Sequence, residues 1–374
     1  MLACLFVAGQ FIANSAVALN QNDLLVSRQD KPVILSEAKD LSRRVLPPNS
    51  PRSPLTSVPS AVIFSCPSEL SHLHFLSLRS SPYFLTSFLP YFAKISAMPN
   101  SFFHSKSILI TGASSGIGEE LALQLAAAGA HLTLTARRKE LLDAVAQKIS
   151  ADGHEKPLVV QADVTRDGDL EHAVSESLRA YNKLDIVIAN AGFGVVAPFS
   201  KLTLDDYRRQ FETNVFGLLR TLYAALPAVK QSRGNLVLIG SVAGWGATPG
   251  ASAYAMSKFA VRALANSITP EFALEGVKVT LISPGFVASN IRRIDNRGTF
   301  HSDASEPIPE WIVMPTATAV HQILRAIAKG KREAVITGHG KALVAIERFA
   351  PWIIRAAGRR MAAKSGGYRS EPKP

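Results

Sequence analysis

Seven short apolar runs recur between Ser107 and Thr337, and segments with helical periodicity separate them. Most of the runs are continuous stretches of Val, Ile and Leu, which is typical of strands buried on both faces of a parallel sheet. We expect these strands at residues 107–110, 131–135, 158–161, 185–189, 235–240, 277–283 and 333–337. Because strands that alternate with helices form right-handed crossovers, the pattern predicts a single doubly wound α/β domain, with a seven-stranded parallel sheet and helices on both faces.

The segments between the strands are expected to be helices, because apolar residues return in them at helical spacing. Their predicted ranges are 119–128, 141–150, 169–181, 203–226, 252–274 and 316–329. Thr165 is a candidate cap for the helix that begins near residue 169. In a doubly wound sheet the ligand crevice lies outside the carboxyl ends of the strands, so the residues that follow each strand are the candidates for a functional site.

Residues 1–97 differ from the rest of the chain, because they hold both cysteines and 9 of the 22 prolines and show no persistent apolar period. Three interpretations are open: a secretory signal, a flexible anchor or regulatory tail, and an upstream stretch that is absent from the native protein. A signal would begin with basic residues, but the first one here is Arg28. We favour Met98 as the true start, because the orderly pattern begins within ten residues of it. The chain then divides into 1–97, a domain at 98–340 and a basic amphipathic tail at 341–374.

Charge and apolar patterning exclude several classes of protein. The net charge is +12, yet no basic stripe with interleaved aromatic residues appears, so we expect no nucleic-acid partner. No run of about 18 uninterrupted apolar residues is present, so we expect no transmembrane helix. Because no cysteine follows residue 97, the domain has no thiolate chemistry, and we expect no metal site in it.

A glycine-rich turn follows the first strand and opens a helix. Its candidate cofactor-binding residues are Gly112, Ser114, Ser115, Gly116, Ile117 and Gly118. Glycines let a backbone approach a pyrophosphate closely, and the helix N-terminus supplies N–H donors and a positive dipole end. An ordinary turn between strand and helix can also hold three glycines, so it is the strand–turn–helix context that favours a nucleotide site.

Basic residues follow the second strand, at Arg137, Arg138 and Lys139. A site for NAD usually places Asp or Glu here to bond the ribose hydroxyls. Arginine can instead bind a 2′-phosphate through two hydrogen bonds, so the sequence points to NADP(H) rather than NAD(H), with Arg137 as the candidate residue. The competing interpretation is a solvated basic start of the next helix.

Small or polar residues follow the third and fourth strands. Asp163 and Val164 come after the third strand, where the carboxylate could accept the adenine amino group or cap the next helix. The fourth strand is followed by Asn190, Ala191 and Gly192, which allow a ribose or a neighbouring loop to approach closely.

Three residues after the fifth strand could carry acid–base chemistry. Ser241 follows the strand directly, Tyr254 comes thirteen residues later, and Lys258 lies one helical turn beyond it. A free tyrosine has a pKa near 10, roughly three units above neutral pH, and we expect the neighbouring ammonium to pull that pKa down. Tyr254 would then be a credible general acid and base. The Tyr–Lys spacing alone is common in helices, so its place after the fifth strand carries the argument.

Together these residues resemble the classical short-chain dehydrogenases/reductases. The matching positions, in the family's order and spacing, are Thr111, Gly112, Gly116, Ile117, Gly118, Asp163, Val164, Asn190, Ala191, Gly192, Asn214, Ser241, Tyr254, Lys258, Pro284, Gly285, Phe286 and Val287. The resemblance spans residues from about 105 to 340 and nothing before Met98. It implies a Rossmann-type fold and the transfer of a hydride between a nicotinamide and a carbonyl or alcohol group.

The resemblance also implies a role for each matched residue. Tyr254 would exchange a proton with the substrate oxygen, Ser241 would hydrogen-bond that oxygen, and Lys258 would tune Tyr254 and hold the nicotinamide ribose. Asn214 would hold a water that links Lys258 to solvent. Pro284, Gly285 and Val287 would line the nicotinamide pocket. Ser289 stands where the family often has Thr, and it keeps a hydroxyl for the carboxamide.

The substrate pocket is expected after the fourth, fifth and sixth strands. Phe193, Val242, Trp245 and Phe286 are its apolar candidates, and the segment 290–314 has the length and irregularity of a mobile lid. We therefore expect an NADP-dependent oxidoreductase for a moderately lipophilic ketone or secondary alcohol. The alternatives are a noncatalytic NADP-binding regulator or scaffold on the same fold, and sugar-nucleotide epimerisation, which the glycine spacing disfavours.

The resemblance implies a homodimer or homotetramer through the helices that carry Asn214 and Tyr254. The tail 341–374 could lie on a membrane surface as a basic amphipathic helix, although Pro351 interrupts it. The expected location is cytoplasmic, with peripheral membrane contact as a further option.

Overall fold

The computed structural model describes residues 100–288 and 309–364 of the chain. All of them belong to the unit Phe88–Pro374, one of the two units into which internal contacts divide the chain. The expected extension at 1–97, the proposed start at Met98, Ser289, most of the expected lid and the last ten residues lie outside the described residues.

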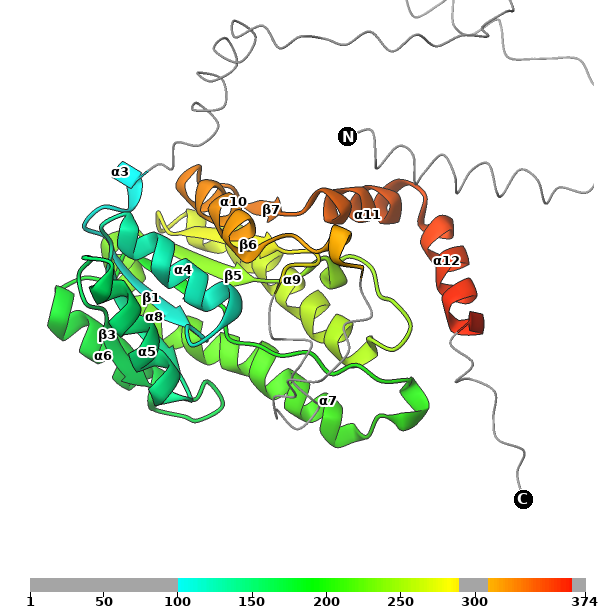
Figure 1. Ribbon diagram of the computed structural model, residues 1–374, viewed down its shortest axis with the longest axis horizontal. Coiled ribbons are helices and arrows are strands. Elements are labelled where there is room, and N and C mark those ends of the chain that lie inside the picture. The colour runs from blue at the N-terminus through cyan, green and yellow to red at the C-terminus, as the bar shows by residue number, and fades with distance from the viewer. Residues whose placement is uncertain (1–99, 289–308, 365–374) are drawn as a thin grey trace, which may run out of the picture. The chain divides into compact units, whose positions relative to one another are not determined.

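A seven-stranded sheet forms the centre of this unit (Figure 1). Its strands are β1 (Ser107–Thr111), β2 (His131–Ala136), β3 (Leu158–Gln161), β4 (Ile186–Ala189), β5 (Asn235–Ile239), β6 (Lys278–Ser283) and β7 (Glu333–Val335). The order across the sheet is β3-β2-β1-β4-β5-β6-β7, and every neighbouring pair is parallel. The doubly wound parallel sheet expected from the sequence is therefore confirmed. Its order reverses between β1 and β4, where such sheets bind their ligands.

Helices connect the strands. They are α3 (Asn100–Phe103), α4 (Gly116–Ala127), α5 (Lys139–Ala151), α6 (Asp169–Tyr181), α7 (Leu204–Phe211), α8 (Gly217–Ser232), α9 (Ser252–Ala273), α10 (Thr316–Ala328), α11 (Gly338–Phe349) and α12 (Pro351–Lys364). Short helical turns are η3 (Phe199–Lys201), the π-helical η4 (Glu212–Phe216), η5 (Val242–Gly244) and η7 (Glu310–Ile312).

Two apolar cores cover the two faces of the sheet, because successive side chains of a strand point to opposite faces. Ile108 and Ile110 of β1 pack in one core with α4, α5 and α10. Leu109, between them, packs in the other core with α6, α8 and α9. All five residues of β1 are buried, which explains why the three residues at its centre form an uninterrupted apolar run.

The long helix expected at 203–226 is continuous but not uniform. It begins as α7, where Thr203 caps the first turn and Asp206 returns the bond, passes through the π-helical η4 and continues as α8. A π-helical turn changes the rotation of the side chains that follow it, and such turns occur often at functional sites. The one here contains Asn214.

One local expectation was wrong. Thr165 does not cap α6, because the N-cap is Gly168, whose φ of 89° suits a glycine. The division at residue 340 cuts a helix, because α11 starts at Gly338, and Pro351 then opens α12 as its first residue. The sequence predicted that Pro351 interrupts the tail, and the structure has a break between α11 and α12 at this point.

Candidate active site

The glycine turn between β1 and α4 forms a cradle that only glycines can line. Gly112 and Gly116 have φ values of 66° and 59°, in the left-handed region. A Cβ on Gly112 would come within 2.9 Å of the Ala191 Cα, and a Cβ on Gly118 would overlap the carbonyl oxygen of Gly112. Ser115 is the N-cap of α4 and makes no side-chain cap bond. The open N-terminus and bare backbone fit the pyrophosphate of a dinucleotide.

Asn190 fixes the turn from the next strand of the sheet. Its side-chain amide donates to the carbonyl oxygens of Thr111 (2.9 Å) and Gly112 (3.2 Å). The Thr111 hydroxyl accepts the backbone N–H groups of Asn190 and Ala191, each at 3.1 Å. Asn190 therefore ties β4 to the glycine turn at the point where the sheet order reverses, so its amide N–H groups serve the protein rather than a ligand.

The side chain that follows β2 is exposed to solvent, whereas those that follow β3 are used within the protein. Arg137 is exposed at the end of β2, and its carbonyl accepts a bond from Gln161 of β3 at 2.8 Å. Asp163 closes a turn instead of capping α6, because its Oδ1 accepts the N–H (3.0 Å) and the hydroxyl (2.8 Å) of Thr165. Val164 is buried against Gly217 at the start of α8.

Ser241 and Tyr254 meet at the end of β5. Ser241 caps η5 by accepting the N–H of Ala243 at 3.1 Å, and its hydroxyl lies close enough to the Tyr254 phenol to affect the pKa of that phenol. Burial raises the pKa of Tyr254, and the Ser241 hydroxyl lowers it by a smaller amount. The net lowering expected from the sequence is therefore not found in the chain alone, because burial dominates. Tyr254 is therefore a neutral phenol at neutral pH, which suits a proton donor.

Lys258 is a buried cation one turn beyond Tyr254. Only 5% of its surface is exposed, and its Nζ donates to the carbonyl oxygen of Ile239 at 2.9 Å. The Nζ lies 5.8 Å from the centroid of the Tyr254 ring. Burial lowers the pKa of Lys258 from 10.5 to about 8, because an ammonium loses hydration inside the protein. The backbone of α9 at Lys258 packs closely on η5, since a Cβ on Gly244 would lie 2.6 Å from the Lys258 carbonyl oxygen.

Asn214 braces the loop after β4 against α9. Its Oδ1 accepts the Phe193 N–H at 3.0 Å, and its Nδ2 donates to the Phe193 carbonyl (3.0 Å) and to the Ser257 hydroxyl (3.1 Å). Ser257 in turn donates to the Tyr254 carbonyl at 2.7 Å. A Cβ on Gly192 would come within 3.0 Å of the Asn214 Oδ1. Both N–H groups of the side-chain amide are thus used by the protein, and the water that the resemblance implies stays a prediction.

The loop after β6 carries Pro284, Gly285 and Val287. The Pro284 carbonyl accepts the Val242 N–H at 2.9 Å, which joins this loop to η5. Val287 is buried and forms a bridge with Met314. The Phe286 N–H donates to Nε2 of His339, on the first turn of α11, at 2.9 Å. Sequence patterns gave no sign of His339, because it follows β7, more than 50 positions from the loop that it contacts.

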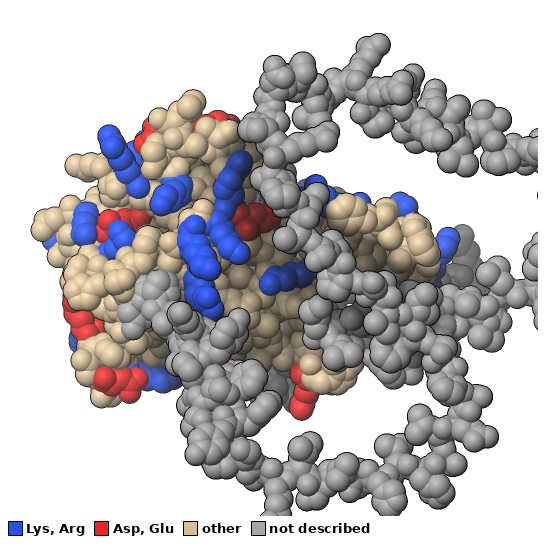
Figure 2. Space-filling model, turned by 90° about the horizontal axis from the view of Figure 1, so that it is seen from above, with Lys and Arg blue, Asp and Glu red and all other residues tan. Residues whose placement is uncertain are grey.

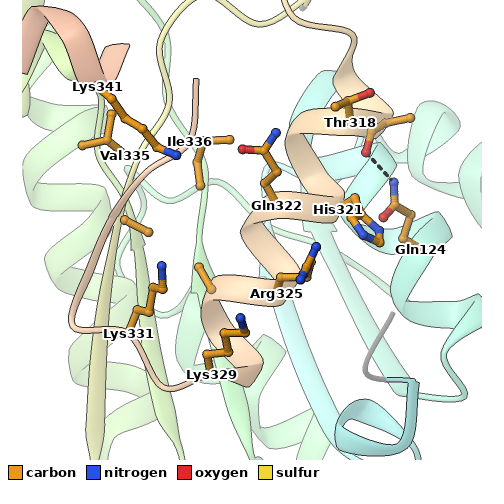
Figure 3. Close-up of a pocket in the computed structure, with 13 residues that line it drawn as sticks. Gln124, Thr318, His321, Gln322, Arg325, Lys329, Lys331, Val335, Ile336 and Lys341 are labelled. Carbon is orange, nitrogen blue, oxygen red and sulfur yellow. Dashed lines mark hydrogen bonds between the residues drawn. The ribbon is translucent and has the colours of Figure 1, made fainter. Parts of the chain in front are cut away.

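A cavity of about 840 Å³ at the β7 edge of the sheet does not belong to this site. Its lining includes five side chains that can carry positive charge, namely His321, Arg325, Lys329, Lys331 and Lys341. Figure 2 shows Lys and Arg side chains gathered on the face that carries α10 and β7, and Figure 3 shows that Gln124 contributes from α4. None of the candidate catalytic residues lines it.

The structure brings Ser241, Tyr254, Lys258 and Asn214 together beside the glycine cradle, at the carboxyl ends of β1, β4 and β5. Among the described residues no group of three His, Cys, Asp or Glu could hold a metal ion. A buried ammonium, a phenol and a hydroxyl can stabilise and protonate an oxygen that gains negative charge.

Comparison with known proteins places this arrangement in a family. The short chain dehydrogenase model matches residues 106–298. A dehydrogenase/reductase SDR family protein 7-like from Dictyostelium discoideum is 30% identical over 288 residues, which cover 73% of this chain and 86% of that protein. The 11-beta-hydroxysteroid dehydrogenase 1A of Arabidopsis thaliana is 35% identical over 248 residues, with coverage of 63% and 69%.

A solved short-chain type dehydrogenase/reductase from Mycobacterium marinum is 25% identical, covers 65% of this chain and 99% of its own, and superposes with a TM-score of 0.57. The family match covers more than half of the chain and includes the glycine turn, Ser241, Tyr254 and Lys258. The resemblance expected from the motifs is thereby confirmed, and the chain belongs to the short-chain dehydrogenase family of NAD(P)-dependent oxidoreductases.

Proposed function

We propose that this oxidoreductase uses NADP(H) to interconvert a moderately lipophilic ketone and its secondary alcohol. The observation that carries the proposal is the placement of the Ser241 hydroxyl and the Tyr254 phenol beside the buried Lys258, whose Nζ lies 5.8 Å from the centroid of the Tyr254 ring. The first test is the absorbance of NADPH during incubation with a panel of ketones, aldehydes and diketones. Loss of the absorbance with members of the panel, and not without them, supports the proposal.

Tyr254 and Ser241 act on the substrate oxygen. The nicotinamide, when bound, supplies or accepts the hydride. As the carbonyl carbon is reduced, negative charge develops on its oxygen, and the Tyr254 phenol gives that oxygen its proton. The Ser241 hydroxyl, whose single proton turns from the phenol to the substrate when the substrate binds, donates a second hydrogen bond to the same oxygen. In the oxidative direction Tyr254 takes the proton back from the alcohol.

Lys258 and Asn214 support this proton transfer. The Lys258 ammonium favours the phenolate that remains after the proton has left, because opposite charges attract strongly in a buried site. Asn214 keeps the loop after β4 and the Tyr254 turn of α9 in register through Phe193 and Ser257. A noncatalytic regulator would gain nothing from a buried ammonium beside a phenol, so no observation favours that alternative.

Arg137 supports the choice of NADP(H). The guanidinium is exposed where the adenosine ribose of a dinucleotide lies in this fold, and an arginine can bind a 2′-phosphate with two hydrogen bonds. Its neighbour Arg138 is also exposed and forms the N-cap of α5. No ion pair to a described residue holds either guanidinium, so both can serve a phosphate.

Replacement of Arg137 by Ala is expected to raise the KM for NADPH by roughly 10- to 100-fold, because hydrogen bonds to a charged phosphate are lost. The KM for NADH should change by less than about threefold, since NADH has no 2′-phosphate. Steady-state kinetics with both cofactors measures this. Arg208→Ala, which removes an exposed arginine paired with Asp205 on α7, is the matched control. Equal changes for both cofactors would contradict the role of Arg137.

The pH dependence of reduction follows from Lys258. Its pKa of about 8 lies below its usual value, so the ammonium is present at neutral pH and is lost as the pH rises through 8. Tyr254, whose pKa is raised, stays protonated over this range. The kcat/KM measured with varied NADPH reports ionisations of the free enzyme. It should be flat near neutral pH and fall above about pH 8, approaching tenfold per pH unit. A profile that stays flat to pH 10 would contradict this assignment.

The substrate class rests on the apolar walls of the site. Phe286 is partly exposed beside the nicotinamide loop, and Phe193 follows β4. Trp245 is less available to contact a substrate, because the Arg262 guanidinium stacks on its ring, 3.3 Å from the ring centroid. The match to a hydroxysteroid dehydrogenase fits a lipophilic substrate, and steroid ketones therefore belong in the carbonyl panel.

Association through α8 and α9 remains a prediction. Tyr223 on α8, Met256 and Phe259 on α9, and Phe216 at the end of η4 are exposed apolar residues, which are typical of a subunit interface. Membrane contact also remains a prediction. Within the described residues no helix has the length and hydropathy to cross a bilayer. Phe349 and Trp352 are 80% and 65% exposed at the junction of α11 and α12, near Arg348 and Arg355.

A further inference from the structure

The first turn of α11 contacts the loop after β6 through His339. The Nε2 atom of His339 accepts the backbone N–H of Phe286 at 2.9 Å and lies 3.0 Å from the Thr337 hydroxyl oxygen. The imidazole also stacks on the Phe286 ring, with centroids 5.4 Å apart and planes 22° from parallel. One side chain thus holds both the backbone and the ring of Phe286.

The loop fits against this turn only because residue 285 is a glycine. A Cβ on Gly285 would overlap the Thr337 hydroxyl and lie 2.5 Å from Nε2 of His339. Thr337 itself is completely buried, and its hydroxyl accepts the Gly340 N–H at 3.1 Å as the N-cap of α11. The loop after β6 and the first turn of α11 are therefore closely packed and hydrogen-bonded to each other.

The protonation state of His339 suits this task. To accept the Phe286 N–H, Nε2 must be unprotonated, which places the ring proton on Nδ1. Burial lowers the pKa of His339 below its usual value, so the ring is neutral at neutral pH.

The same turn of α11 also reaches the loop that carries Ser241. A Cβ on Gly340 would come within 2.8 Å of Val242 in η5, and the Val242 N–H donates to the Pro284 carbonyl at 2.9 Å. The loops after β5 and β6 are thus joined to each other and to α11. The two loops lie within the family match, but α11 lies outside it, because the match ends at residue 298, 40 positions before α11 begins.

We propose that His339 is a positioning residue of this enzyme, which holds the Pro284–Val287 loop in the geometry that receives the nicotinamide. This inference rests on the proposed function, because the loop serves the cofactor only if the chain binds NADP(H). His339 touches no reacting atom. It acts through the Phe286 N–H, whose bond would otherwise be lost, and an active-site displacement of about 1 Å can cost about 100-fold in rate.

The test compares His339→Leu with His339→Gln in the full chain. Leu fills the space but cannot accept a hydrogen bond, whereas the Gln side-chain oxygen can reach the position of Nε2. His172→Leu, at an exposed histidine on α6, is the matched control. Two readouts are used: hydrogen exchange of the peptide that contains Phe286, and the Kd of NADPH from quenching of tryptophan fluorescence. Thermal unfolding accompanies both, so that a general loss of structure is recognised.

In His339→Leu, the Phe286 amide should exchange at least about tenfold faster, and the Kd of NADPH should rise about 10- to 100-fold. His339→Gln should restore most of both, and His172→Leu should change neither. Unchanged exchange, or faster exchange with an unchanged Kd, overturns the inference. If wild-type protein bound no NADPH, the proposed function would fail instead, and the exchange result would show separately whether His339 holds the loop.

Discussion

Replacement of Tyr254 by Phe is expected to lower kcat for carbonyl reduction by about 10²- to 10⁴-fold, because the substrate oxygen loses its proton donor. The change removes one hydroxyl and leaves the ring, which packs near Gly194. The Kd of NADPH should stay within about twofold of wild type, since the phenol hydroxyl serves the transition state more than the bound cofactor. Single-turnover absorbance with saturating NADPH separates the chemical step from binding.

The matched control is Tyr223→Phe on α8, where the tyrosine is 71% exposed. It removes the same atom outside the site and should leave kcat unchanged. Ser241→Ala should show a smaller loss than Tyr254→Phe, because Ser241 donates a hydrogen bond but no proton. Full activity in Tyr254→Phe would show that another group supplies the proton, and the mechanism above would then be wrong.

Replacement of Lys258 by Met is expected to abolish most activity and to stabilise the fold at neutral pH. The folded pKa of about 8 against 10.5 in the unfolded chain means that the buried ammonium costs about 3 kcal/mol below pH 8. Met removes that cost, and the carbonyl of Ile239 loses a donor worth about 1 kcal/mol, so a net gain of about 2 kcal/mol remains.

The sign of the pH effect distinguishes this explanation from better packing. Between pH 8 and 10.5 the unfolded wild-type chain still holds the proton and the folded chain does not, so wild-type stability from this group rises with pH. A methionine side chain has no such ionisation, and the advantage of Lys258→Met should shrink as the pH approaches 10. Urea unfolding at neutral and alkaline pH measures it, with the exposed Lys329→Met as control. A variant less stable than wild type at neutral pH would contradict the account.

The fold was predictable because burial on both faces leaves a plain trace in the sequence. Every residue of β1, β4 and β5 is buried, and the central residues of each strand form an unbroken apolar run. The helices between the strands require a parallel sheet. The ends of elements were less accurate. The helix expected from residue 119 begins at Gly116, because glycines at a helix start are chosen for close packing and carry no apolar periodicity.

The site was predictable only where local spacing carries the chemistry. Tyr254 and Lys258 lie one turn apart on one helix, and the glycine turn is a single segment, so both leave a pattern that can be read. The π-helical turn around Asn214 and the bond from His339 to Phe286 leave none, since they depend on contacts across the fold. The raised pKa of Tyr254 has the same origin, because its largest cause is burial by segments distant in the sequence.

Transfer of a labelled hydride tests the central claim most directly. NADPH that carries deuterium on its reactive carbon is incubated with the enzyme and a ketone from the panel, and the product is examined by mass spectrometry. The account predicts a secondary alcohol with deuterium on the carbinol carbon, formed by wild-type protein and by Tyr223→Phe but not by Tyr254→Phe. NADPH binding without deuterated alcohol from any ketone, aldehyde or diketone, or equal product from Tyr254→Phe, would contradict it.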